Sequence, residues 1–91
     1  MQVRVEFLGL ARRRAGRPDI ELVLEGRQTS LKEVLHALAQ HLPALGGELW
    51  TGSELAAHWT ICVDGAQFVR DPATLVRDGQ CLWVMSADAG G

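Results

Sequence analysis

The sequence predicts a small α+β protein in which one main helix covers one face of a mixed sheet of four or five strands. Residues 2–7 and 20–25 alternate apolar and polar side chains, which is the period of a half-buried strand. Residues 31–42 carry apolar side chains at steps of three and four, which indicates an amphipathic helix. Short strand-like segments separated by Asp-Gly turns follow, so two strands, a helix and two or three strands are expected.

Length and composition limit the classes of function. Ninety-one residues, 47% of them hydrophobic and 22% charged, describe one domain with a modest core and little room for an enclosed active site. The net charge of −2 argues against a nucleic-acid partner. No apolar run approaches the roughly 18 residues of a membrane span, and no signal-peptide pattern precedes the first strand. We therefore expect a cytoplasmic protein with no membrane partner.

The first two strands are expected to form a hairpin. Odd-numbered residues from Val3 to Phe7 share one face of the first strand, and even-numbered residues from Ile20 to Leu24 share one face of the second. The segment between them, Gly9 to Asp19, is rich in arginine and contains Gly16 and Pro18, which predicts a loop. We interpret arginines 12–14 in this loop as part of a solvated turn; the alternative is a docking site for an acidic partner or phosphate.

The helix has a clear start and end in the sequence. Ser30 and Glu33 have the spacing of a capping box, in which the hydroxyl accepts a hydrogen bond from the backbone three residues on. Pro43 disfavours helical geometry at the residue before it, and Gly46-Gly47 supplies a stop. These features predict about three turns of helix ending at residue 42. Residues 48–58 have a weak pattern, typical of a loop with one helical turn.

The remaining strands are short. Residues 60–63 and 67–69 flank Asp64-Gly65, whose residue types tolerate the positive φ of a tight turn. Asp78-Gly79 precedes a last strand over residues 81–85. If the last strand lies beside the first, the two run parallel, because the helix belongs to the long connection between them.

The end of the chain has a different character. Residues 86–91 are small or flexible and offer nothing to anchor them to a core, so we expect a folded domain over 1–85 and a flexible tail over 86–91. One interpretation is an untethered end that happens to finish in glycine. The other is that the α-carboxylate of Gly91 is a reactive group, with Ala89 and Gly90 forming a slim segment that can enter a partner's channel. With a pKa near ~3.5 this carboxylate is ionised, so an enzyme would first have to activate it as a mixed anhydride.

These features together resemble the ubiquitin-like β-grasp sulfur carriers, a family that includes the small subunit of molybdopterin synthase and the thiamine-pathway carrier. The motifs that carry the resemblance are Val3-Arg4-Val5-Glu6-Phe7, Ala15-Gly16, Leu42-Pro43, Val63-Asp64-Gly65 and Gly90-Gly91. The resemblance implies a β-grasp roll with no catalytic side chain, no bound cofactor and no metal. It implies that a ubiquitin-activating-like adenylyltransferase uses ATP to adenylate Gly91. The resulting thiocarboxylate would then donate sulfur inside a synthase subunit.

The resemblance leaves the pathway open. Residues 86–89 replace the proline pair and small residue that often precede the glycines, and Gln80 replaces a usual acidic residue. The small subunit of a molybdopterin synthase is the favoured type, and carriers for thiamine, cysteine, methionine or siderophore synthesis are alternatives. A ubiquitin-like modifier of lysines would use the same terminus, although Lys32 is the only lysine in this chain. An interaction module with an accidental Gly-Gly end is a third hypothesis.

Apolar residues on the face opposite the helix predict a partner surface. Leu8 breaks the alternation of the first strand, and Trp83 and Met85 face away from Leu82 and Val84. Unless residues 48–59 cover this face, Leu8, Phe68 and Met85 are the expected docking residues.

Cysteine and histidine residues carry less information. We interpret Cys62 and Cys81 as small, buried hydrophobic residues, and a disulfide between them is geometrically conceivable. His36, His41 and His58 have no metal-ligand spacing.

Overall fold

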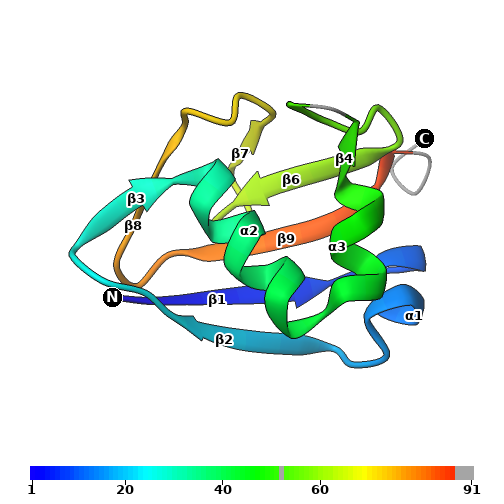
Figure 1. Ribbon diagram of the computed structural model, residues 1–91, viewed down its shortest axis with the longest axis horizontal. Helices are drawn as coiled ribbons and strands as arrows, with labels where there is room; N and C mark the ends of the chain where they lie inside the picture. The colour runs from blue at the N-terminus through cyan, green and yellow to red at the C-terminus, as the bar shows by residue number, and fades with distance from the viewer. Residues whose placement is uncertain (52, 88–91) are drawn as a thin grey trace.

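A five-stranded mixed sheet forms the centre of the computed structural model, which describes residues 1–51 and 53–87 (Figure 1). Its strand order is β2-β1-β9-β6-β7. The strands are β1 (Gln2–Phe7), β2 (Asp19–Val23), β6 (Trp59–Val63), β7 (Gln67–Val69) and β9 (Cys81–Ser86). β1 and β9 pair in parallel, as predicted, and the other neighbours are antiparallel.

Helices α2 (Leu31–His41) and α3 (Pro43–Leu49) lie across one face of the sheet, and α1 (Leu10–Ala15) lies at the edge where β1 ends (Figure 1). Two small ladders complete the fold. β3 (Gln28–Ser30) pairs with β8 (Leu75–Arg77), and β4 (Trp50–Thr51) pairs with β5 (Glu54–Leu55).

The core lies between the sheet and helices α2 and α3. The ladder places Phe7 opposite Val84 and Val84 opposite Ile61, so one face of three adjacent strands carries fully buried apolar side chains. The predicted face of α2 meets them, with Leu31, Val34, Leu35 and Leu38 each 0% exposed. Burial of this apolar surface is the main stabilising contribution to the fold, at about 25 cal/mol per Å² removed from water.

Local signals at α2 and the first tight turn are confirmed. Ser30 Oγ accepts a hydrogen bond from the Glu33 backbone N–H at 3.2 Å, and the helix ends at His41. Asp64 and Gly65 both have positive φ, 53° and 68°, as the Asp-Gly turn requires.

The prediction of a loop from Gly9 to Asp19 is wrong, because residues 10–15 form α1. Ala11 is 0% exposed, so burial of one small side chain stabilises a short helix whose other residues face solvent or lie at the surface. Gly16 ends the helix in the left-handed conformation, with φ 74° and its N–H donating to the Arg12 carbonyl at 2.9 Å.

The prediction that Gly46-Gly47 supplies a helix stop is also wrong, because a second helix, α3, follows α2 and contains both glycines. α2 does end before Pro43, but this proline occupies the first turn of α3, where its missing N–H costs nothing. Gly46 lies within α3 and directly faces Ala39 of α2, where an added Cβ would overlap the Ala39 side chain. The glycine therefore serves close helix packing.

The last strand, expected over residues 81–85, extends one residue further, to Ser86. Ser86 belongs to β9, pairs with Trp59 and is buried. Ala87 continues the ordered chain, because its backbone N–H donates to the His58 carbonyl at 2.7 Å. The rest of the predicted tail, residues 88–91, lies outside the described residues.

In the part of the chain that the structure describes, every helix is too short or too polar to span a bilayer.

Candidate functional site

The end of β9 lies at the centre of one edge of the sheet. β9 is the middle strand of five, with β1 on one side and β6 on the other. The Ser86–Trp59 pair and the Ala87–His58 hydrogen bond hold this end against β6 and the residue before it. The chain therefore leaves the sheet at a defined position. The predicted reactive segment, Ala89, Gly90 and Gly91, lies outside the described residues.

The other side of this exit is built by the end of β1. Because β1 and β9 are parallel, both strands end at the same edge (Figure 1). The Leu8 N–H donates to the Val84 carbonyl at 3.0 Å, which continues the ladder one step past β1. This hydrogen bond brings Leu8 beside the last residues of β9, and α1 begins two residues later.

An apolar surface covers half of the sheet face that points away from α2 and α3. Phe68 lies opposite Cys62, and Cys62 lies opposite Trp83, so three strands contribute one row. Met85 follows Trp83 on the same face of β9, and Leu8 extends the surface at the edge. We call these five residues the open-face patch: Leu8, Cys62, Phe68, Trp83 and Met85.

The three predicted docking residues differ in exposure. Phe68 is 68% exposed and Leu8 39% exposed, whereas Met85 is half-buried. Phe68 lies two strands from Met85, with Cys62 and Trp83 between them in the sheet. Among the described residues of 48–59, the buried apolar side chains of Leu49, Leu55, Ala56 and Trp59 all belong to the core.

Trp83 is the residue that the predicted docking set omits. Alternation along the last strand places it on the open face, but only the pairing with β6 shows that it links the other members. Its ring lies over the Asp64-Gly65 turn, 3.0 Å from the position that a Cβ on Gly65 would occupy. This contact holds the large ring half-buried on the open face.

The other half of the open face is charged. Arg4 Nη2 lies 2.8 Å from Asp19 Oδ2, and Arg4 Nε lies 3.1 Å from Glu6 Oε1. The hydrogen bond that Arg4 donates to Glu6 and the charge of Asp19 raise the pKa of Arg4 above its ordinary value. These are exposed ion pairs, which contribute little to stability but mark a polar border beside the patch.

The two cysteines are free thiols. Cys62 pairs with Trp83, so Cys81 is displaced from it by two residues along β9. Cys62 is buried, as favoured by the sequence, whereas Cys81 is only half-buried. Burial and the nearby Glu6 carboxylate raise the pKa of the Cys81 thiol.

A shallow cavity of about 190 Å³ lies elsewhere, on the helical side of the molecule. Lys32, His36, Trp50 and Ser53 line it. Within residues 1–51 and 53–87, no three His, Cys, Asp or Glu side chains gather closely enough to hold a metal ion.

Solved structures share this architecture. Small archaeal modifier protein 1 (SAMP1) from Haloferax volcanii superposes with a TM-score of 0.84 at 18% identity, covering 100% of both chains. A protein from Pyrococcus furiosus assigned as molybdopterin converting factor, subunit 1, gives 0.76 at 18% identity, covering 94% of this chain and 97% of the other. A chain of the Amycolatopsis orientalis BexX/CysO complex gives 0.72 at 18% identity, covering 98% and 99%.

No protein-family profile and no curated protein matches the sequence. At these identities the shared feature is the arrangement of strands and helices. The chain therefore has the β-grasp fold, which it shares with a small archaeal modifier protein and a molybdopterin converting factor subunit.

Proposed function

We propose that this protein is a ubiquitin-like sulfur carrier whose reagent is the α-carboxylate of Gly91. The observation that carries the proposal is the defined exit of the chain after Ala87, at a sheet edge bordered by an apolar patch whose Leu8 and Phe68 side chains are exposed. Such an arrangement lets a partner grip the folded domain while the last residues enter the partner's active site. The protein then needs no catalytic side chain of its own.

The chemistry of the proposal takes place on the partners. A ubiquitin-activating-like adenylyltransferase joins the Gly91 carboxylate to the α-phosphate of ATP and releases pyrophosphate. The acyl adenylate is a good electrophile, unlike the ionised carboxylate, so a sulfur nucleophile can displace AMP and leave a thiocarboxylate. A synthase subunit then accepts the sulfur. The carrier itself holds no cofactor, because ATP binds to the activating enzyme.

Two structural neighbours support the carrier role. One is assigned as a molybdopterin converting factor subunit, and the other is part of a complex of two proteins. We propose the small subunit of a molybdopterin synthase as the first assignment, with carriers for thiamine, cysteine or methionine synthesis as alternatives. The open-face patch would be the docking surface, with Leu8, Phe68 and Met85 joined by Trp83.

A second candidate is a protein modifier whose activated Gly91 forms isopeptide bonds with lysines of other proteins. The observation that favours it is the superposition on SAMP1 over the full length of both chains. The two candidates share the adenylation step and differ in the nucleophile that attacks the adenylate.

Intact-mass spectrometry tests the proposal. The protein is incubated with ATP, a sulfide source and the adenylyltransferase encoded in the same genome. Replacement of one oxygen by sulfur at Gly91 supports the carrier, and adducts on lysines of other proteins support the modifier. Deleting Gly91 should abolish either product, whereas Ala89→Ser keeps both glycines and should retain it. No modification of the intact chain would contradict the proposed function.

A further inference from the structure

Positive charge gathers at one place in the chain. Four of the nine lysine and arginine residues lie in residues 12–17, although the chain as a whole carries a net charge of −2. Arg12, Arg13 and Arg14 occupy the last turn of α1, and Arg17 follows its C-cap. We call Arg12 and Arg13, with the exposed surface of α1 around them, the basic ridge.

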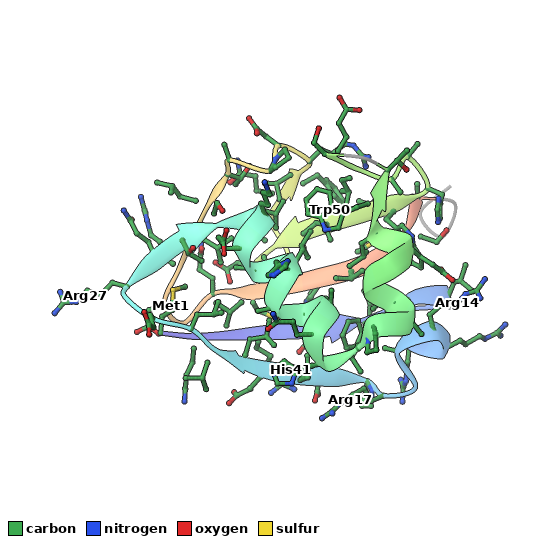
Figure 2. All side chains as sticks on the ribbon, in the orientation of Figure 1. Met1, Arg14, Arg17, Arg27, His41 and Trp50 are labelled. Atoms are coloured by element: carbon green, nitrogen blue, oxygen red, sulfur yellow. The ribbon has the colours of Figure 1, made fainter. Side chains whose placement is uncertain are left out.

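The basic ridge lies at the end of the sheet where β9 ends. α1 follows β1 directly and contacts β9, and the N-terminus lies at the opposite end (Figure 1). Arg14 marks this end of the molecule in Figure 2, and Arg27 marks the other. Leu8 of the open-face patch and Leu10, the first residue of α1, are both exposed at this end.

Two of the four cations have partners within the protein. Arg14 Nη1 lies 3.5 Å from Glu48 Oε1, and Arg17 Nε donates to the Asp19 carbonyl at 2.6 Å. The exposed side chains of Arg12 and Arg13 have no hydrogen-bond or ion-pair partner within residues 1–51 and 53–87. Cations in the last turn of a helix stabilise it, and Arg14 alone can serve that role.

The length of the tail brings a partner close to the ridge. Residues 88–91 can span at most about 14 Å when fully extended. An enzyme that reacts with the Gly91 carboxylate must therefore approach the sheet edge on which α1 lies. Two unpaired arginines at that edge would face the enzyme's surface, and a basic enzyme surface there would repel them.

We propose that the activating enzyme carries an acidic strip beside the entrance of its tail channel, and that Arg12 and Arg13 pair with this strip. The inference rests on the proposed function. An acidic protein surface is favoured over the phosphates of ATP, because the reacting carboxylate, and hence the nucleotide, lies at the far end of the four-residue tail. Charges at the rim of an interface act mainly on the rate at which the two proteins associate and on the dependence of that rate on salt.

Two charge-matched double variants test the inference. Arg12→Gln with Arg13→Gln removes the basic ridge, and Arg27→Gln with Arg77→Gln removes the same charge near the β3–β8 ladder. The measurement is pyrophosphate release by the adenylyltransferase encoded in the same genome, at varied carrier concentration. At about 0.1 M NaCl we expect the ridge variant to raise KM for the carrier on the order of tenfold with kcat retained. The control should change KM less than about twofold, and the difference should shrink near 1 M NaCl.

The outcomes separate this inference from the function on which it depends. If the unaltered protein supports pyrophosphate release and both double variants behave alike, the acidic strip is refuted and the carrier role stands. A raised KM for ATP, in place of a raised KM for the carrier, would also refute the strip, because the arginines would then contact nucleotide phosphate. If the unaltered protein supports no pyrophosphate release, the proposed function fails together with the inference. Equal melting temperatures of the two variants would show that a difference in KM between them does not come from a difference in folding.

Discussion

The indole ring of Trp83 lies against Gly65, so close that a Cβ on this glycine would stand 3.0 Å from the ring. This contact joins the last strand of the sheet to the turn between β6 and β7. It fixes the most bulky member of the open-face patch beside Cys62 and Phe68. A turn that the sequence predicts from backbone preference therefore also shapes the surface on which we expect a partner to bind.

Replacing Gly65 by alanine should disturb both the turn and the patch. Gly65 has φ +68°, so alanine is strained there by about 1 kcal/mol, and its methyl group would also press on Trp83. Gly79→Ala is the matched control, because Gly79 has φ +85° and nothing within 4 Å of an added Cβ. Urea denaturation should show a loss in free energy of unfolding about 1 kcal/mol greater for Gly65→Ala than for Gly79→Ala. Equal losses would mean that the ring contact has no energetic weight.

Neighbouring glycines in α3 should respond in opposite directions. An added Cβ at Gly46 would overlap Ala39 of α2, so Gly46→Ala should force the two helices apart and cost about 1–3 kcal/mol. Gly47 has open space around an added Cβ, and Gly47→Ala should stabilise the helix by roughly 0.5–1 kcal/mol. Thermal melting of both variants measures this difference. A stabilising Gly46→Ala would show that α2 and α3 can separate without cost.

The open-face patch should govern partner binding more than stability. Phe68→Ala removes a 68% exposed side chain, so the free energy of unfolding should change by no more than about 0.5 kcal/mol. Affinity for the activating enzyme should fall on the order of tenfold or more, which is typical of an aromatic side chain at an interface. Calorimetric titration of the activating enzyme with the carrier measures this affinity.

Val23→Ala provides the control for this prediction. Val23 is 77% exposed and lies on the same sheet face, on β2, beyond the charged residues. Its replacement should leave affinity nearly unchanged. Equal losses of affinity for Phe68→Ala and Val23→Ala would place the docking surface elsewhere.

The Cys81 thiol should be protected from alkylation at neutral pH. Burial raises its pKa, so the reactive thiolate is scarcer than for a free cysteine at the same pH. A Cys62→Ala background isolates Cys81, and its iodoacetamide reaction should follow a titration displaced to higher pH than that of an unfolded peptide. The same displacement gives stability below the ordinary cysteine pKa of about 8.5, and this stability is lost as the pH rises through the raised value. A titration at or below that of the peptide would contradict the prediction.

Much of the fold follows from local patterns that a single sequence contains. Alternation predicts β1 and β2, apolar runs beside the two Asp-Gly turns predict β6, β7 and β9, and the Ser30–Glu33 spacing predicts the start of α2. The loop prediction for residues 9–19 failed because α1 is too short to show a helical period. Its stabilising feature is the burial of Ala11 against distant parts of the chain. The β3–β8 ladder was missed for a related reason, since its two strands lie more than forty residues apart.

The sequence by itself determined the five strands of the main sheet, the main helix and the Asp64-Gly65 turn, because these depend on side-chain pattern and on backbone preferences within a few residues. Only the tertiary structure decided that Trp83 joins Phe68 to Met85, and that α1 stands beside the end of β9. Both relationships arise from the parallel pairing of β1 with β9 and the antiparallel pairing of β9 with β6. Pairings between distant strands depend on how the whole core packs, and no local period encodes them.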